Sequence, residues 1–210
     1  MQDIAHQVAA HLLNIEAIKL SPEKPFKWSS GWNSPIYCDN RVSLSFPLVR
    51  TFIKNALAEI IKKHFPEVEV IAGVATAGIP QGVLVAEALE LPAIYVRPEP
   101  KKHGMANQIE GKLHAGQKVV VIEDLISTGG SSLKVVDVLR EAGAEVLGMV
   151  AIFNYGFQVA TDNFSQKNVT LVCLSNYETL IVEALKLDYI NKNQLDSLSE
   201  WRKNPSEWGE

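Results

Sequence analysis

The chain has 210 residues, which is room for one domain of ordinary size and too little for two large ones. Hydrophobic residues make up 47% and charged residues 21%, which excludes a disordered chain, and no apolar run approaches the roughly 20 residues that a membrane span needs. The net charge of -4 argues against a general nucleic-acid binder.

The cysteines and the N-terminus indicate the cellular setting. Cys38 and Cys173 have neither the pattern of a disulfide framework nor metal-ligand spacing. The first residues lack the basic and then apolar pattern of a signal peptide. We therefore expect a cytoplasmic, reduced setting, with no membrane and no nucleic acid among the partners.

The N-terminal part is expected to combine one helix with irregular structure. Apolar residues recur every three or four positions from Asp3 to Leu20, which predicts a helix that Ser21-Pro22 ends. Residues 25–41 are rich in proline, glycine and serine around two tryptophans, which predicts turns with short strands.

From residue 46 onward, strands and helices alternate. The predicted helices cover residues 46–64, a segment that starts at Gly78, residues 130–142 and residues 179–185, the last preceded by a capping box, Ser175-Asn176-Tyr177-Glu178. The predicted strands cover residues 67–74, 93–97, 118–122, 145–153 and 169–174. This alternation predicts an α/β fold with a mostly parallel central sheet flanked by helices.

A long polar segment, residues 97–117, joins two of the predicted strands. It contains two prolines and three glycines and has no apolar period. Compact domains rarely contain such a loop without a function. It is either a disordered insertion or a lid that closes over a site.

Three groups of residues follow predicted strands, at the edge of a parallel sheet where ligands bind. Glu123-Asp124 precedes the turn Ser127–Ser131, which enters a helix and can bind an anion. Ala75–Gly78 is a second turn of small residues before a helix. The long loop adds cations that suit a charged leaving group, namely Arg97, Lys101, Lys102 and His103.

The acid pair has two interpretations. It marks an exposed strand end, or it holds a ligand, because buried acids are costly unless they are paired. The chain lacks both the Walker motif and the dinucleotide-binding glycine motif. Two carboxylates that grip adjacent hydroxyls, next to a turn that holds a phosphate, fit a phosphorylated ribose.

Residues 119–131, VVVIEDLISTGGS, resemble the phosphoribosyl-diphosphate signature of the type I phosphoribosyltransferases over all thirteen positions. SSGWNSPIYCDNR (29–41), GVATAGIP (73–80) and RPEPKKHGMANQIEG (97–111) are similar to the orotate phosphoribosyltransferases. The resemblance implies the type I phosphoribosyltransferase fold, with a small N-terminal hood and a mobile catalytic loop.

The resemblance also implies the organisation of the chain. We expect a single phosphoribosyltransferase domain over residues 1–210. Its expected parts are an N-terminal helix and base-binding hood (about 1–45), a core (about 46–175), a mobile loop within it (about 97–117) and C-terminal helices (176–210).

Residue roles follow from the resemblance, position by position. Glu123 and Asp124 are expected to hold the ribose hydroxyls, and Ser127, Thr128, Gly129, Gly130 and Ser131 to bind the 5'-phosphate, with Ser127 also near orotate. Leu125 and Ile126, between the two groups, are expected to belong to the substrate-binding stretch as well. The turn Ala75, Thr76, Ala77 and Gly78 is expected to contact the diphosphate through its backbone. The expected catalytic residues are Arg97, Lys101, His103 and Asp124.

The implied reaction transfers ribose 5-phosphate from 5-phosphoribosyl 1-diphosphate to orotate, giving orotidine 5'-monophosphate and diphosphate in pyrimidine synthesis. Mg²⁺ is expected as a cofactor that the phosphoribosyl diphosphate mainly binds, with no metal ligands assigned in the protein. A homodimer is implied as well, because the family's mobile loop typically reaches into the neighbouring subunit's site.

The sequence departs from the family pattern in its basic residues. Several orotate enzymes have lysines where this chain has Ala77, Pro98 and Ser29, so the contacts to the orotate carboxylate are open, and Lys27 is not assigned to them. Two alternatives also remain: a phosphoribosyltransferase for uracil or a purine, and a non-catalytic sensor of phosphoribosyl diphosphate.

Some conspicuous residues have plain structural interpretations. Trp28, Trp32 and Tyr37 are expected to close over a core in preference to stacking on a base. Lys102 is as well explained by a solvated charge as by a ligand role. Residues 201–205 are expected to be the frayed end of a last helix.

Overall fold

The fold was analysed in a computed structural model, which describes residues 2–28, 31–97, 99 and 108–208. The helices are α1 (Gln2–Asn14), α2 (Pro47–His64), α3 (Gly78–Leu89), α4 (Gly130–Glu141), α5 (Gln158–Gln166), α6 (Tyr177–Lys186) and α7 (Leu195–Lys203), with the 3-10 helices η1 (Asn40–Ser45) and η2 (Lys192–Gln194). The strands are β1 (Ile18–Leu20), β2 (Phe26–Lys27), β3 (Asn33–Ser34), β4 (Ile36–Cys38), β5 (Val70–Val74), β6 (Ala93–Val96), β7 (Ile109–Glu110), β8 (Lys118–Ile126), β9 (Glu145–Asn154) and β10 (Leu171–Asn176).

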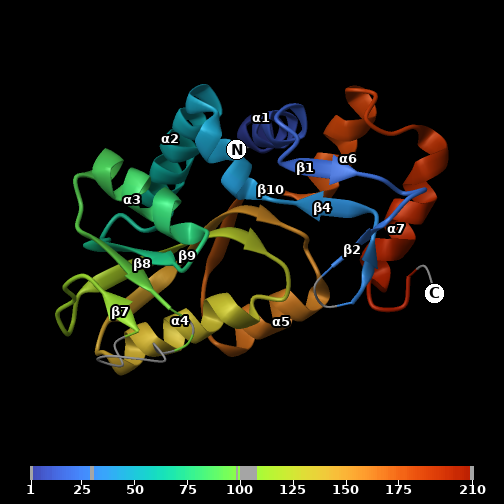
Figure 1. Cartoon of the computed structure of the whole chain (residues 1–210). Coiled ribbons are helices and arrows are strands. Elements are labelled where there is room, and N and C mark those ends of the chain that lie inside the picture. Colours follow the sequence, from blue (N-terminus) through green and yellow to red (C-terminus); the bar gives the residue numbers. More distant parts are fainter. Residues whose placement is uncertain (1, 29–30, 98, 100–107, 209–210) are drawn as a thin grey trace. The chain divides into compact units, whose positions relative to one another are not determined.

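A six-stranded sheet in the order β10-β9-β8-β5-β6-β7 forms the centre of the fold (Figure 1). Strand β5 pairs in parallel with β6 and β8, and β8 pairs in parallel with β9. Strand β7, in the loop segment, pairs antiparallel with β6. The predicted α/β class and mostly parallel sheet are confirmed.

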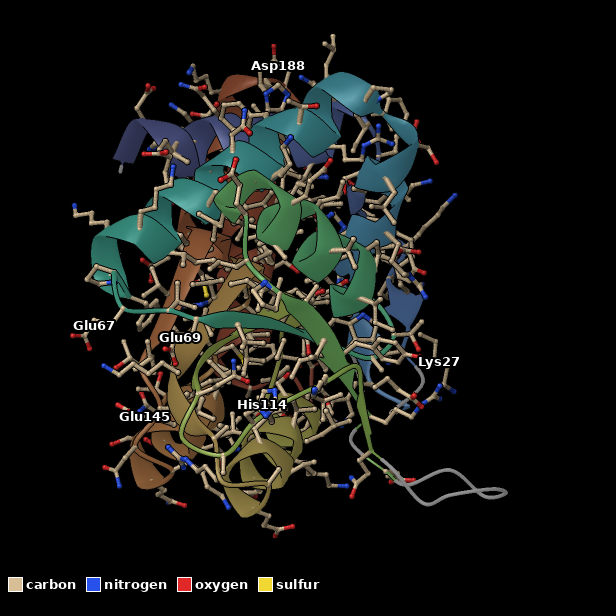
Figure 2. All side chains as sticks on the ribbon, turned by 90° about the vertical axis from the view of Figure 1, so that its left-hand side faces the viewer. Lys27, Glu67, Glu69, His114, Glu145 and Asp188 are labelled. Carbon is tan, nitrogen blue, oxygen red and sulfur yellow. The ribbon has the colours of Figure 1, made fainter. Side chains whose placement is uncertain are left out.

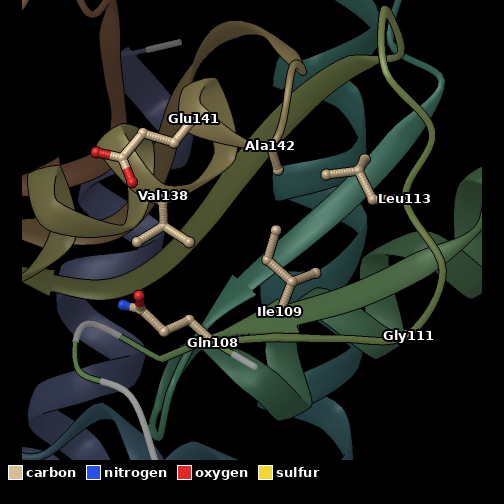
Figure 3. A pocket seen from close by; sticks show the side chains of 7 residues that line it. All are labelled: Gln108, Ile109, Gly111, Leu113, Val138, Glu141 and Ala142. Atoms are coloured by element: carbon tan, nitrogen blue, oxygen red, sulfur yellow. The ribbon is translucent and has the colours of Figure 1, made fainter. Parts of the chain in front are cut away.

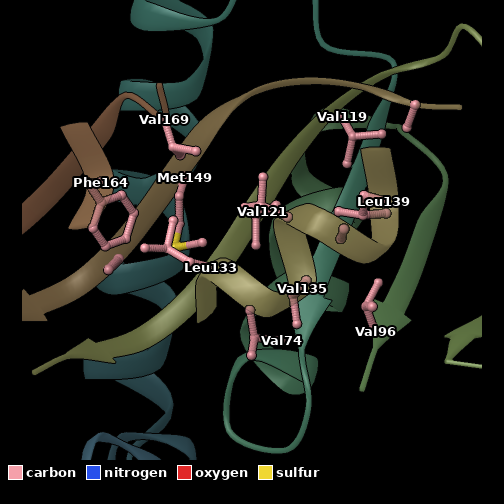
Figure 4. Close-up of a cluster of buried hydrophobic side chains, with 14 of the residues drawn as sticks. Val74, Val96, Val119, Val121, Leu133, Val135, Leu139, Met149, Phe164 and Val169 are labelled. Atoms are coloured by element: carbon pink, nitrogen blue, oxygen red, sulfur yellow. The ribbon is translucent and has the colours of Figure 1, made fainter. Parts of the chain in front are cut away.

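One cluster of buried hydrophobic residues lies where β8 and its neighbours meet α4 and α5 (Figure 4). Residues 119–122 of β8 are all fully buried, as expected for a strand covered on both faces. Leu133, Val136 and Leu139 give α4 a buried stripe at helical spacing. Phe164 of α5 is part of the same cluster.

Several predicted boundaries were wrong. The first helix ends at Asn14, because Glu16 adopts the left-handed conformation with φ 56° and Ile18–Leu20 then pairs with β4. The predicted strand over 118–122 continues to Ile126, since β9 pairs with it up to Asn154. Strand β7 and helix α5 were not predicted. The capping residue of α6 is Asn176, whose side chain accepts from the Thr179 N–H.

The chain divides into two compact units, residues 1–50 with 175–210 and residues 51–174. In the first unit α1 packs on α6, where His6 Nδ1 lies 2.8 Å from Glu183 Oε1. Trp201 is fully buried there, with its ring centroid 5.7 Å from that of Trp28 and 5.5 Å from that of Tyr177. The expectation of a frayed end at residue 201 was therefore wrong. The single-domain assignment stays a prediction.

Charged side chains gather around the start of three central strands, at the opposite ends from the acid pair. Glu67, Glu69 and Glu145 all interact electrostatically with Lys118, whose Nζ lies 2.6 Å from Glu67 Oε2 (Figure 2). The hydrogen bond to Glu67 is the main cause that raises the pKa of Lys118. Because these groups are exposed and already paired, they stabilise the fold only weakly. No described helix is long and apolar enough to cross a membrane.

Candidate active site

The acid pair lies inside β8, not after it. Glu123 pairs with Ala151 of β9, and its side chain is buried, with 6% of the residue exposed. Asp124 is half-buried. Successive residues of a strand point to opposite faces, which explains why the two acids have different environments. Of the two interpretations of the acid pair, an exposed strand end is therefore wrong for Glu123.

Glu123 is held by two hydrogen bonds. The Ser132 hydroxyl donates to Oε2 at 2.7 Å, and the Asp124 N–H donates to Oε1 at 3.0 Å. Burial raises the pKa of Glu123 to about 8, with a further contribution from the Asp124 charge, while these two donors act in the opposite direction. Ser132 lies directly after the recognised motif, is buried, and was missed because only its neighbour Ser131 matched the family signature.

The phosphate turn, Ser127–Ser131, connects β8 to α4. Gly129 caps the helix in the left-handed conformation, with φ 76°, which glycine adopts without strain. Gly129 has no side chain that could accept hydrogen bonds from the first N–H groups of α4. These N–H groups, together with the positive end of the helix dipole, are therefore donors for a ligand. Ser127 and Thr128 are half-buried, and Gly130 and Ser131 are exposed. This combination suits an anion.

Leu125 and Ile126 connect the acid pair to the phosphate turn. Leu125 is half-buried and pairs with Phe153, whereas the Ile126 side chain is fully buried in the hydrophobic core. The Ile126 carbonyl accepts from the Tyr155 N–H at 3.1 Å. These contacts fix the chain that leads into the turn.

The second turn, Ala75–Gly78, lies against the acid-pair strand. A Cβ at Gly78 would collide with the Ile122 carbonyl oxygen, so only glycine allows this approach. Ala75 donates its N–H to the Val96 carbonyl at 2.9 Å, and the peptide bond between Ala75 and Thr76 is cis. Thr76 is exposed, and Ala75 and Ala77 are half-buried. The structure thus places the second turn against the strand that leads into the phosphate turn.

Arg97 lies at the base of the long loop. Its backbone N–H donates to the Gln108 carbonyl at 2.9 Å, and the Gln108 amide donates back to the Arg97 carbonyl at 3.2 Å. The Arg97 guanidinium is 5.8 Å from the centre of the Tyr95 ring, and its Nε lies 3.9 Å from Glu110 Oε1. Lys101, Lys102 and His103, together with Pro98, lie outside the described residues.

A hollow of about 460 Å³ lies between the segment around β7 and the C-terminal end of α4 (Figure 3). Its lining is Gln108, Ile109, Gly111, Leu113, Val138, Glu141 and Ala142. Among the lining residues that the structure describes, the one charged group is the Glu141 carboxylate, which would repel a phosphate. This hollow is therefore a poor site for a sugar phosphate.

The predicted hood contains two short antiparallel strand pairs. Strand β2 pairs with β3, and β1 pairs with β4. The Trp28 ring N–H donates to the Ile36 carbonyl at 3.0 Å, and the Trp28 and Trp32 rings stack 6.5 Å apart. These contacts favour the structural interpretation of both tryptophans. Tyr37 is 43% exposed, so its expected burial was wrong. The side chain of Lys27 is exposed (Figure 2).

Comparison with known proteins supplies the family. Residues 47–185 match the model of the phosphoribosyl transferase domain. The chain is 61% identical over 202 residues to the orotate phosphoribosyltransferase of Cytophaga hutchinsonii, covering 96% of this chain and 97% of that protein. It is 56% identical over 206 residues to that of Listeria innocua, covering 98% and 99%.

The fold comparison agrees. The crystal structure of orotate phosphoribosyltransferase from Aeropyrum pernix superposes with a TM-score of 0.76 at 30% identity, covering 88% of this chain and 99% of that one. The chain belongs to the phosphoribosyltransferase family and, within it, to the orotate phosphoribosyltransferases, which are pentosyltransferase enzymes.

Proposed function

We propose that this orotate phosphoribosyltransferase binds phosphoribosyl diphosphate along the end of β8 and transfers its ribose 5-phosphate to orotate, giving orotidine 5'-monophosphate for pyrimidine synthesis. The observation that carries the proposal is the continuous path from Asp124 to the first turn of α4. A carboxylate for the sugar and backbone donors for the phosphate lie five to seven residues apart along this path.

The two acids have different proposed tasks. Asp124 is half-buried near the C-terminal end of β8 and accepts hydrogen bonds from the ribose hydroxyls. The negative charge of its carboxylate strengthens these hydrogen bonds. Glu123 accepts hydrogen bonds from the Ser132 hydroxyl and from the Asp124 N–H, so its carboxyl group is already oriented before the sugar binds. Preorganisation of this kind lowers the cost of binding.

Opposite charges develop on the ribose ring and on the diphosphate during the proposed reaction. As the bond between the ribose carbon and the diphosphate breaks, the ribose ring becomes positive and the diphosphate gains negative charge. The Asp124 carboxylate favours the positive ring. The backbone of Ala75–Gly78 and the cations Arg97, Lys101 and His103 are proposed to stabilise the departing diphosphate, because fixed donors and cations act on charge that builds up in the transition state.

We propose that Mg²⁺ is held mainly by diphosphate oxygens and water. The described residues include no grouping of three His, Cys, Asp or Glu side chains suited to a metal ion. Mg²⁺ commonly takes its ligands from substrate phosphates and water, so the donors in the described part of the chain fit this arrangement. When bound, Mg²⁺ neutralises part of the charge on the diphosphate.

Turnover with different bases tests the function. The protein is mixed with phosphoribosyl diphosphate, Mg²⁺ and either orotate, uracil or hypoxanthine. Release of diphosphate is measured for each base, and loss of orotate's ultraviolet absorbance is followed in the orotate sample. We expect turnover with orotate, for which Ser127 is a proposed contact. Turnover with uracil or hypoxanthine alone would identify a different base, and binding of phosphoribosyl diphosphate without any turnover would indicate a sensor.

The proposed assembly is a cytoplasmic homodimer in which the loop of one subunit covers the diphosphate in the other. Its support is the sequence similarity of residues 97–111 to the family's mobile loop. Mixing inactive Lys101→Ala with inactive Asp124→Asn should restore part of the activity, because a hybrid dimer has one site with both residues intact. No recovery, once subunit exchange has been verified, would contradict a shared site.

A further inference from the structure

Helix α5, which the sequence did not predict, contacts the phosphate turn directly. The side-chain amide of Asn163 donates to the Thr128 carbonyl oxygen at 2.9 Å. The ring of Phe164, the next residue, packs against Gly129: a Cβ added to Gly129 would be 2.6 Å from the ring carbon Cε2. Two consecutive residues of α5 thus hold two consecutive residues of the turn, and α4 and α5 lie side by side (Figure 1).

We infer that Asn163 is a positioning residue for the 5'-phosphate: by holding the Thr128 carbonyl it aims the N–H of Gly129 away from α5 and toward the bound phosphate. This inference rests on the proposed assignment of the phosphate turn.

Peptide geometry connects the two groups. The Thr128 carbonyl and the Gly129 N–H belong to one planar peptide unit. Among the described residues the cis peptide is Ala75–Thr76, so the Thr128–Gly129 unit is trans and its carbonyl and N–H point in opposite directions. Fixing the carbonyl toward Asn163 therefore fixes the N–H on the opposite side. In a turn that binds an anion through backbone donors, this orientation decides the affinity.

The core gives α5 a fixed position from which to act. Phe164 is 4% exposed and Ala160 2% exposed, and both belong to the same buried cluster as Leu133 of α4. Asn163 itself is half-buried, so a water molecule can replace its amide as a donor to Thr128. Water satisfies the carbonyl but does not hold its direction, so loss of Asn163 should affect phosphate binding more than folding.

The test measures the dissociation constants of ribose 5-phosphate and of diphosphate by calorimetry. For Asn163→Ala we expect ribose 5-phosphate to bind about tenfold more weakly, which corresponds to one well-oriented hydrogen bond, and diphosphate to bind as in the wild type. Asn163→Asp should weaken ribose 5-phosphate further, since a carboxylate cannot donate to the carbonyl and repels the phosphate.

The matched control is Gln158→Ala. It removes another side-chain amide hydrogen bond of α5, from Nε2 to Asp162 Oδ1 at 2.9 Å, that does not reach the turn. It should leave the affinities for both ligands unchanged. Unchanged ribose 5-phosphate binding in Asn163→Ala, or an equal loss for both ligands with a lower melting temperature, would overturn the positioning role.

Ser131→Ala separates this inference from the assignment of the turn. If Ser131→Ala weakens ribose 5-phosphate binding and Asn163→Ala does not, the turn binds phosphate and only the role of Asn163 fails. If neither variant weakens it, the turn is not the phosphate site and both proposals fail.

Discussion

The phosphate turn and the N-terminal hood differ in the sequence separation between each region and the residues that hold it in place. The turn, Ser127–Ser131, follows directly from β8 and enters α4, and Glu123 is held by Ser132, nine residues away. The hood depends on Trp28, whose ring contacts Trp201 at the far end of the chain. A short motif can therefore indicate a site, but it does not indicate the distant residues that support the site, such as Trp201 for the hood.

The difference also affects the expected sensitivity to mutation. At the phosphate turn, substitutions should mainly change ligand binding, because the first N–H groups of α4 are donors for a ligand. In the unit that contains the hood, substitutions of the buried aromatic cluster should mainly change stability, because these rings fill a core. Four substitution experiments, in order of expected effect, test this contrast.

The largest expected effect concerns Trp201. Trp201→Ala removes a fully buried ring and should lower the free energy of unfolding by about 3 to 5 kcal/mol, measured by urea denaturation. Trp208→Ala, at a half-buried position, is the control and should cost far less. If the folded Trp201→Ala protein also loses as much affinity for ribose 5-phosphate as a turn variant, the contrast between effects on stability and effects on binding is contradicted.

The second effect concerns Asp124. Asp124→Asn keeps the size of the side chain and removes its charge, so kcat/KM should fall about a hundredfold while the melting temperature changes little. Steady-state kinetics and a thermal melt on the same preparation measure both quantities. A wild-type rate in this variant would contradict the assignment of the acid pair.

The third effect concerns Ser132. Ser132→Ala removes the donor to Glu123 Oε2 and should lower kcat/KM for phosphoribosyl diphosphate about tenfold, because the buried carboxyl group loses its orientation. Ser165→Ala, at an exposed position of α5, is the control. If the two variants have the same kinetics, the role of Ser132 is limited to packing.

The smallest effect is a dependence of stability on pH. Because the pKa of Glu123 is raised to about 8 in the folded protein, the unfolded chain releases this proton first as the pH rises. The contribution of Glu123 is therefore fully present below about pH 4.5 and is lost as the pH rises through about 8, with a slope of at most about 1.4 kcal/mol per pH unit.

Glu123→Gln removes this titration. Its free energy of unfolding, measured by urea denaturation from pH 5 to pH 8, should fall less steeply than that of the wild type. Parallel curves for the two proteins would show that Glu123 titrates normally in the folded state.

Sequence patterns predicted the parts of the fold whose contacts are local. The apolar run before Glu123 gave the central strand, and the glycine turn gave the start of α4. The length of β8 was not predictable, since it depends on pairing with β9 up to Asn154. Helix α5 was missed because its segment, QVATDNFSQ, is mostly polar and has only two buried residues, Ala160 and Phe164.

Long-range packing explains the remaining misses. The predicted first helix was too long because the apolar spacing continues through Ile15 and Ile18, although Ile18 belongs to a strand that pairs with Cys38. Trp201 seemed to belong to a frayed end because its partners, Trp28 and Tyr177, are distant in sequence. The same limit applies to Asn163, whose partner Thr128 lies 35 residues before it.

Hydrogen exchange with and without ribose 5-phosphate tests the central claim most directly. If β8 and the phosphate turn hold the ribose 5-phosphate, exchange of the amides over residues 127–133 should slow on binding, while residues 31–38 of the hood exchange as before. Unchanged exchange over residues 127–133, with protection elsewhere in the chain, would contradict the assignment of this turn as the phosphate site.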